Sequence, residues 1–519
     1  MPVLRRAARL GALLLALAAA PAAAQGTSYE QLQTFSSLLN QIRSSYVDSV
    51  AYGELVQAAI AGVLESLDPH SRFVSRAAAE REMAYEGGNL AGAGIVLDEV
   101  EYGLTVLAVY PRSGAARAGV SAGDRLIAVN DTSVFGLTAS EAMGRLIGEK
   151  GRKVRLLLTR GNVLAPDSVR VQVKFDIVEP RSVGLARMVD ATTGYLRLDG
   201  FWAKGREEVE RAIKDLKGKG MKRLIFDLRG NPGGSVGAAV EIASLFFPEK
   251  TLIFKTLGRR STANNEFFTE TDGPFRELPL MVLIDDGSAS ASEALAGSLQ
   301  DHDRALILGR RSFGKALMQR LFLVPPQNDV VWLTVGRIVT PSGRIIQRAY
   351  RGLKAAQYYS FAGGTGISRD TSLLYRTDKG REVRGGGGIQ PDVVLPGSPE
   401  LPGWFSVAAD SGWYEAIADS VAGTLATQPA ARAAWMGAGG EWQSRLVEPF
   451  LGRIRTRLNL NVTPDGPLAA RLGRILAYRA AEVRWGPDAA DEFTVRNDPD
   501  ILAANQRWAD VQAVTGMKP

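Results

Sequence analysis

Three serines follow one short apolar run, and their position suggests nucleophilic catalysis. The segment MVLIDDG leads directly into GSASASEALAGSLQ, which contains Ser288, Ser290 and Ser292. The residues from 291 onward have the pattern of a helix, so Ser290 falls at a helix N-terminus, where unpaired backbone N–H groups can stabilise an oxyanion. Glu293 lies three positions after Ser290, and this is also the S-x-x-E spacing of a capping box. Spacing alone therefore leaves Ser290 as either a nucleophile or a helix cap.

A serine nucleophile needs a base, and the chain has only two histidines. A helix would carry His302 ~18 Å away from the serine at 1.5 Å per residue, and His70, in the turn LDPHS, suits a structural role better. Lys315 in RSFGKALMQ is the stronger candidate, because a desolvated lysine can be neutral near pH 7 and accept a serine proton. The alternative for Lys315 is a solvated surface lysine. Gln319 would share one side of a helix or strand with Lys315, and its amide oxygen could orient the amine.

Strand and helix patterns alternate after residue 180, which predicts a parallel or mixed sheet with helical crossovers. Functional residues gather at the carboxyl ends of strands in such sheets. The runs RGNPGG and DDGSAS each follow a predicted strand, so both lie where a site would form. The predicted strands are 193–200, 223–230, 280–287, 305–309 and 331–346, and the predicted helices are 204–217, 236–247 and 291–301.

A small β-rich module is predicted before this region, over residues 86–160, where short alternating strands are separated by glycine-containing turns. The segments AGAGIVL, PRSGAARAGVSAGDRLIAVND and VRLLLTR resemble a PDZ domain. In that family a loop before a strand offers backbone N–H groups to a peptide's terminal carboxylate, and the peptide adds as a strand beside it. The resemblance assigns that loop to Gly92, Ala93, Gly94 and Ile95.

The first residues have the pattern of a secretory signal peptide. Arginines precede an apolar stretch at 10–20, and small residues then end at Ala24, where we expect cleavage. The chain has no cysteine, which excludes disulfides, thiolate metal sites and a cysteine nucleophile. Removing the three arginines of the leader lowers the formal charge of +7 by three, so the basic balance is weak evidence for nucleic acid. A periplasmic or secreted protein is predicted.

Four motifs in order resemble the carboxyl-terminal processing peptidases, which are serine–lysine endopeptidases that carry a PDZ domain. They are FDLRGNPGG, GSASASEALAGSLQDHDRALILG, RSFGKALMQ and LTVGRIVTPSGRIIQ, and LDPHS and GGGGIQPD extend the match over roughly residues 30–395. The chain departs mildly from the family in having alanine after the lysine and glycine after the arginine of RGNPGG. The resemblance implies the roles of nucleophile, base and orienting amide for Ser290, Lys315 and Gln319. It implies oxyanion donors at the N–H of Ala291 and of Gly233 or Gly234.

We therefore predict an α+β multidomain endopeptidase that binds protein or peptide substrates with free C-termini and needs no metal or cofactor. An envelope adaptor lipoprotein and a homo-oligomer are possible partners, and no nucleic acid is expected. A non-catalytic peptide-binding or chaperone-like protein on this scaffold is the alternative. A Ser-His-Asp esterase using Ser288 or Ser292 is disfavoured, because G-x-S-x-G is absent. The expected parts are a signal peptide (1–24), a helical N-terminal segment (25–85), a PDZ domain (86–160), a peptidase core (161–395) and a helical C-terminal extension (396–519).

Overall fold

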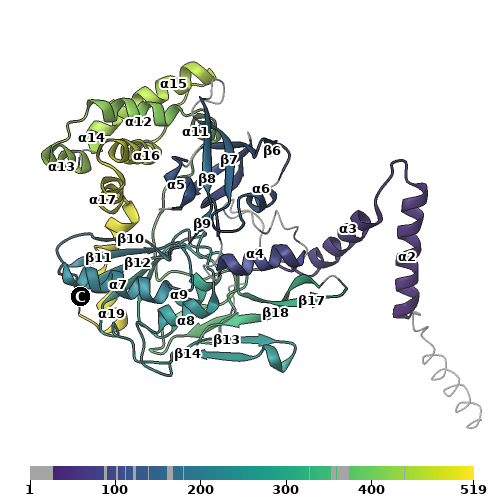
Figure 1. Cartoon of the computed structure of the whole chain (residues 1–519). Helices are drawn as coiled ribbons and strands as arrows, with labels where there is room; N and C mark the ends of the chain where they lie inside the picture. Colours follow the sequence, from purple (N-terminus) through teal and green to yellow (C-terminus); the bar gives the residue numbers. More distant parts are fainter. Residues whose placement is uncertain are drawn as a thin grey trace, which may run out of the picture. The chain divides into compact units, whose positions relative to one another are not determined.

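The computed structural model describes most of the chain from residue 27 to residue 518 (Figure 1). The predicted signal peptide lies outside the described residues. Within the described part, no helix combines the length and the apolar character that a membrane crossing requires. The chain forms two units, residues 1–73 and 74–519. The segments left out between residues 27 and 518 are 87–90, 101–102, 111–112, 121–123, 138, 161–166, 179, 327, 352, 354–357, 359–372 and 438.

The first unit is helical, as its sequence pattern predicts. Helix α2 begins with a capping box in which Thr27 and Glu30 exchange side-chain and backbone hydrogen bonds. The turn LDPHS that follows the second helix is closed by Asp68, whose carboxylate accepts the N–H groups of His70 and Ser71, both at 2.8 Å. The helices are α2 (Ser28–Ser45) and α3 (Tyr52–Glu65).

The β-rich module of the second unit is an antiparallel sheet with strand order β3-β4-β5-β7-β8, with the short strand β6 pairing β5. Strand β8 pairs with β7 along its whole length, so the sheet continues beyond residue 160, where the sequence pattern predicted the module to end. The elements are β2 (Ala91–Gly92), β3 (Ile95–Val100), β4 (Gly103–Val109), α5 (Gly114–Arg117), β5 (Arg125–Val129), β6 (Thr132–Ser133), α6 (Ala139–Arg145), β7 (Lys153–Arg160), β8 (Asp167–Lys174) and β9 (Asp176–Ile177).

The site is carried by a six-stranded sheet with order β10-β11-β12-β15-β16-β21, the core sheet. Strands β11, β12, β15, β16 and β21 are parallel, and β10 is antiparallel to β11. The carboxyl ends of β12, β15 and β16 therefore meet at one edge. The elements are β10 (Val183–Met188), β11 (Thr193–Leu198), α7 (Gly205–Gly218), β12 (Arg223–Asp227), α8 (Val236–Ala243), β15 (Leu280–Ile284), α9 (Ala291–Asp301), β16 (Leu306–Gly309) and β21 (Val393–Val394).

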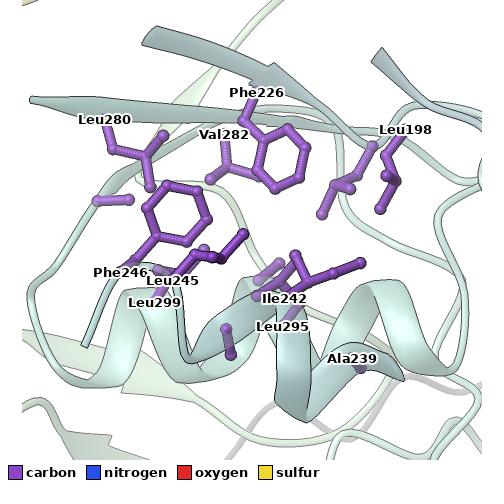
Figure 2. Close-up of a cluster of buried hydrophobic side chains, with 14 of the residues drawn as sticks. Leu198, Phe226, Ala239, Ile242, Leu245, Phe246, Leu280, Val282, Leu295 and Leu299 are labelled. Atoms are coloured by element: carbon purple, nitrogen blue, oxygen red, sulfur yellow. The ribbon is translucent and has the colours of Figure 1, made fainter. Parts of the chain in front are cut away.

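One face of the core sheet is covered by α7, α8 and α9, which pack through a large apolar cluster. Figure 2 shows Phe226 and Val282 of the sheet directed toward Ile242 of α8 and Leu295 of α9. All four side chains are fully buried. Burying side chains of this size stabilises a fold by about 1.5–3 kcal/mol each, so this layer fixes α9, and with it the serine segment, against the strands.

A second sheet contains β13, β14, β17 and β18, and β18 pairs with both β13 and β17. The described part of residues 351–390 contains the hairpin of β19 and β20. The elements are β13 (Leu252–Gly258), β14 (Asn265–Phe268), β17 (Leu317–Val324), β18 (Asp329–Val339), β19 (Leu374–Arg376) and β20 (Glu382–Arg384).

The C-terminal residues are helical, and their apolar side chains belong to two clusters, to both of which α17 contributes. Helices α11 to α17 bury their own aromatic and aliphatic cluster. Apolar residues of α18 and α19, such as Ile501, Trp508 and Val511, pack instead with Tyr195 and Ile225 on the second face of the core sheet. The helices are α11 (Gly403–Asp410), α12 (Trp413–Thr424), α13 (Pro429–Gly437), α14 (Gly439–Trp442), α15 (Glu448–Leu458), α16 (Gly466–Trp485), α17 (Pro487–Asn497), α18 (Pro499–Ala504) and α19 (Trp508–Thr515).

The predicted fold class, α+β with a small β-rich domain, a mixed core and a helical C-terminal region, is thus confirmed.

Candidate active site

The serine segment follows β15 and its three hydroxyl groups differ in their surroundings. Ser288 and Ser292 are fully buried. The Ser288 hydroxyl donates to the carbonyl of Leu228 at 2.7 Å, and the Ser292 hydroxyl donates to the carbonyl of Asn231 at 2.9 Å. Both serines thus tie this segment to the loop after β12. Ser290 is partly exposed at the N-terminus of α9.

The backbone of Ser290 has a φ of +58° and a ψ of −113°. This combination is strained for a residue with a side chain, and such strain concentrates at functional sites. Ser290 is partly exposed, whereas Ala289 and Ala291 on either side of it are buried. Helix α9 begins at Ala291. Among the described residues, no hydrogen-bond acceptor is recorded for the N–H of Ala291, as expected of a first-turn donor.

Glu293 links the serine segment to the lysine segment. Its Oε2 accepts the N–H of Ser290 at 2.9 Å and the N–H of Lys315 at 2.8 Å. Its Oε1 accepts the hydroxyl of Ser312 at 2.5 Å and the N–H of Gly314 at 2.7 Å. Since one oxygen atom accepts from both, the backbone nitrogens of Ser290 and Lys315 are separated by less than twice the length of one hydrogen bond.

The carboxylate of Glu293 is buried, with 1% of the residue exposed. Burial raises its pKa from an ordinary 4.5 to about 7, although the four hydrogen bonds oppose this shift. The sequence indicated Glu293 only as the partner of Ser290 in a helix cap. Its bonds to Ser312, Gly314 and Lys315 depend on tertiary contacts, so no local pattern could reveal them.

The loop after β12, residues 228–234, lies against the serine segment. A Cβ added to Gly233 would lie 2.8 Å from the carbonyl oxygen of Ala289, 2.9 Å from the Cβ of Ser290 and 3.0 Å from the nitrogen of Ala291. Gly233 also has a φ of +105°, so only glycine fits this close approach without strain. The glycine motif therefore lies at the N-terminus of α9. The sequence predicted that RGNPGG and the serine segment both lie at the carboxyl ends of strands, and the structure brings them together.

The two glycines of the loop use their N–H groups differently. The N–H of Gly233 donates to the side-chain oxygen of Asn231 at 2.9 Å. Gly234 has a φ of +138°, and a Cβ there would lie 2.6 Å from the carbonyl oxygen of Phe201. No acceptor within the described residues is recorded for the Gly234 N–H. The sequence left open which glycine donates, and this difference favours Gly234 as the partner of Ala291.

Lys315 follows β16 and precedes β17, and its side chain is partly buried. Gln319 lies in β17, opposite Thr334 of β18, and its amide nitrogen donates to the Thr334 hydroxyl at 3.2 Å. A register shift lies between Met318 and Gln319. The predicted contact between the Lys315 amine and the Gln319 amide oxygen stays a prediction.

The histidine of the second unit is not arranged as a base for the serines. His302 ends α9, and its ring nitrogens contact a carboxylate oxygen of Asp378 and the carbonyl of Leu252, each at 2.7 Å. It also packs edge-on against Phe247. These contacts give His302 a structural role and leave the esterase alternative without a base in the second unit.

In the β-rich module, strand β3 is an edge of the sheet. The N–H of Tyr110 donates to the carbonyl of Gly94 at 2.9 Å. In an antiparallel ladder the bonded pairs alternate, so Ile95, opposite Val109, directs its N–H and C=O toward the outer edge. The N–H of Ala93 is engaged by the carbonyl of Leu146 at 2.8 Å. The first backbone N–H group of β3 that can donate to an added peptide strand is therefore that of Ile95.

The rest of the predicted loop is tightly packed. Gly92 is buried, and a Cβ there would lie 2.7 Å from the carbonyl oxygen of Leu146. Gly94 has a φ of +79°, and a Cβ there would lie 2.1 Å from the Cβ of Ser113. The glycines thus allow the close approach of backbone segments that shapes the entry to β3.

Within the described part of the chain, no group of three or more histidine, aspartate or glutamate side chains could hold a metal ion. The chemistry that this arrangement supports is nucleophilic attack by a hydroxyl at a helix N-terminus. The groups available for it are Ser290, a lysine anchored beside it, and backbone donors of Ala291 and the glycine loop.

Comparison with known proteins matches two parts of the chain to protein families. Residues 192–355 match the model of peptidase family S41, and residues 105–160 match the model of the PDZ domain. A carboxy-terminal-processing protease of Bartonella bacilliformis is 34% identical over 324 residues, which cover 62% of this chain and 73% of that protein. A carboxyl-terminal-processing protease of Picosynechococcus is 32% identical over 277 residues, covering 53% of this chain and 66% of that protein. A solved structure of a photosystem II D1 C-terminal processing protease is 23% identical and covers 71% of this chain and 94% of its own, with a TM-score of 0.40.

Proposed function

Because the chain belongs to the carboxy-terminal-processing protease family of serine-type peptidases, we propose that it is an endopeptidase with a Ser290–Lys315 dyad. The observation that carries this proposal is the shared carboxylate of Glu293, which holds the backbone of both residues at one oxygen atom. A nucleophile and a base on segments so far apart in sequence need such an anchor. Serine–lysine pairs are an established variant of the catalytic triad.

The neutral amine of Lys315 takes the proton of the Ser290 hydroxyl as its oxygen attacks the carbonyl carbon of the scissile peptide. The oxyanion of the tetrahedral intermediate accepts hydrogen bonds from the N–H groups of Ala291 and Gly234. The Lys315 ammonium then protonates the leaving amine, which leaves an acyl ester on Ser290. Water hydrolyses this ester, with Lys315 again accepting a proton, and Gln319 orients the amine throughout.

The PDZ domain supplies the recognition of the substrate's C-terminal region. The edge of β3 can receive an extended peptide as a further strand, since Ile95 turns its backbone groups outward. The loop of Gly92, Ala93, Gly94 and Ile95 then lies at the end of that strand, near the substrate's carboxylate. Substrates are accordingly unfolded or envelope proteins with free C-termini.

The proposed compartment is the periplasm or the extracellular space, because a leader of the secretory type precedes the described residues. Mass spectrometry of the mature protein from an envelope fraction checks this, and an N-terminus at Gln25 is expected. An adaptor lipoprotein and a homo-oligomer remain proposals, which affinity purification from the same fraction tests.

The catalytic proposal is tested by measuring cleavage of an unfolded protein by the wild type and by Ser290→Ala and Lys315→Ala. Both variants are expected to be inactive with an unchanged fold, and their combination should be no worse than either one, because the two groups act as a unit. Lys379→Ala is a matched control, since Lys379 donates to carbonyls of Val514 and Thr515 away from the serine segment. Cleavage by Ser290→Ala would refute the proposal and favour a different nucleophile.

The role of the PDZ domain is tested with a substrate whose C-terminus is free or amidated. The chain enters the PDZ domain at β2 and leaves it at β9, and these two strands pair with Ala91 opposite Ile177. Residues 92–176 can therefore be replaced by a short glycine–serine bridge. A variant that cuts slowly and without regard to amidation indicates a tether, and an inactive variant indicates a gate. Unchanged sensitivity to amidation would show that the C-terminus is recognised elsewhere.

A further inference from the structure

The end of the chain reaches the loop that carries the glycine motif. Arg229 lies in that loop, directly before Gly230, and donates to two carboxylates near the C-terminus. Its Nη1 lies 3.1 Å from Oδ1 of Asp498 and 2.9 Å from Oδ2 of Asp500, and its Nη2 lies 3.0 Å from Oδ2 of Asp498. The Arg229 side chain is 15% exposed, so these are partly desolvated, charge-assisted bonds.

The same guanidinium is fixed from the core side. Its Nε lies 3.0 Å from both oxygens of Asp227 and its Nη2 lies 2.6 Å from Oδ2, while the hydroxyl of Tyr195 donates to that Oδ2 at 2.7 Å. Asp227 and Tyr195 are both 1% exposed. Arg229 therefore connects the last residue of β12 to the start of α18. The glycine-containing residues 230–234 follow Arg229 directly in the chain.

Asp500 also reaches the serine segment through a second arginine. Nη1 of Arg310, the residue after β16, donates to Oδ2 of Asp500 at 2.8 Å. Nη2 of Arg310 lies 3.7 Å from Oδ2 of Asp285, which follows β15. Oδ1 of Asp285 accepts the N–H of Gly230 at 2.8 Å. The carboxyl ends of three parallel strands are thus connected through one carboxylate of the C-terminal region.

We propose that Asp500, acting through Arg229 and Arg310, is a positioning residue that holds the loop of Gly230 to Gly234 in register with the N-terminus of α9. The C-terminal extension is then part of the catalytic machinery, although the family model match ends at residue 355. This inference rests on the proposed function, because it assumes that the loop donates to the oxyanion. Small displacements of such donors cost large factors in rate.

Asp500 is a better residue to substitute than Asp498. Asp498 also caps α18, since its carboxylate accepts the N–H groups of Asp500 and Ile501. Replacing Asp498 would therefore disturb the helix itself. Asp500→Asn keeps the shape of the side chain and removes only the charge that holds the two arginines.

Asn505→Ala is the matched control, because Asn505 docks the same helix at the opposite edge of the sheet. Its amide donates to Asp190 at 2.9 Å and accepts the hydroxyl of Thr193, the first residue of β11, at 3.0 Å. Losing these bonds loosens the docking of α18 without touching Arg229. A general loss of stability should therefore appear in both variants, and a loss of loop position should appear only in Asp500→Asn.

The experiment measures kcat, KM and melting temperature of full-length Asp500→Asn and Asn505→Ala on an unfolded protein substrate. We expect kcat of Asp500→Asn to fall tenfold or more with KM within about twofold, while Asn505→Ala keeps its kcat at a similar melting temperature. An equal loss of kcat in both variants, or a wild-type kcat in Asp500→Asn, overturns the proposal. If Asp500→Asn does not fold, Arg310→Gln removes one of its two partners and should lower kcat severalfold, and an unchanged kcat again overturns it.

Ser290→Ala, measured in parallel, separates the two levels of the argument. An inactive Ser290→Ala with an unaffected Asp500→Asn refutes only the positioning role. An active Ser290→Ala refutes the proposed function itself.

Discussion

Replacing Glu293 by glutamine should change how stability depends on pH. In the wild type the pKa of Glu293 rises from 4.5 to about 7 on folding, because the carboxylate is buried. The folded state therefore holds the proton more tightly than the unfolded state. The contribution of this group to the free energy of unfolding is complete below pH 4.5 and is lost as pH rises to 7. The loss amounts to about 3 kcal/mol, at 1.36 kcal/mol per pKa unit.

Glutamine stays neutral, so Glu293→Gln lacks this pH dependence, but it also loses hydrogen bonds. The carboxylate accepts two donors at each oxygen, and glutamine has only one oxygen. The amide nitrogen should face Ser312, whose hydroxyl can rotate, and Gly314, whose N–H then loses its acceptor. That costs about 1–3 kcal/mol. The variant should be the less stable protein at pH 5 and should approach the wild type at pH 8.

The assay is urea unfolding of both proteins at pH 5, 6, 7 and 8, followed by tryptophan fluorescence. Between pH 5 and pH 8 the free energy of unfolding of the wild type should fall by about 2–3 kcal/mol relative to that of Glu293→Gln. Glu266→Gln is the control, because the Glu266 side chain is exposed on β14, and its difference from the wild type should stay constant. A difference between Glu293→Gln and the wild type that does not change with pH would refute the reasoning.

Four further substitutions test the site. Lys315→Arg should be inactive at every pH, since a guanidinium cannot accept the proton, whereas wild-type kcat should rise with pH; cleavage by the arginine variant would rule out the dyad. Ser288→Ala and Ser292→Ala should keep most of their activity but lose about 0.5–1.5 kcal/mol of stability, because each removes one of the two hydrogen bonds that a backbone carbonyl accepts; melting curves and rates measured together show this, and loss of acylation in Ser292→Ala alone would contradict it. Gly233→Ala should lower kcat by up to about a hundredfold, because its Cβ would lie 2.9 Å from the Cβ of Ser290 and 3.0 Å from the nitrogen of Ala291, and displacing these groups should cost about as much as losing one oxyanion donor; a wild-type kcat would mean that the loop does not shape the site.

Much of this arrangement follows from local sequence patterns. Alternating strands and helices predict a parallel or mixed sheet, and hence an edge at which RGNPGG and the serines meet. The order of its strands was not predicted. Helix α9 begins and ends where its sequence pattern predicts, at Ala291 and Asp301. These features depend on periodicity and on residues near one another in the chain.

Other features depend on contacts between distant segments and leave no local signal. The carboxylate of Glu293 has its helix-cap spacing in the sequence, but its bonds to Ser312 and Gly314 arise only when β16 lies beside β15. The strand β8 is an exception, because its sequence DSVRVQVK has the alternation of a strand, although the module was expected to end at residue 160. The contact of Arg229 with Asp500 joins residues 271 positions apart, which no spacing rule covers.

The most direct test of the central claim is to identify the residue that reacts with a fluorophosphonate. The wild type is treated with the reagent, digested and mapped by mass spectrometry, together with Lys315→Met. The account predicts a single adduct on Ser290, formed slowly or not at all in Lys315→Met. An adduct on Ser288 or Ser292, or labelling that persists in Ser290→Ala, would contradict it.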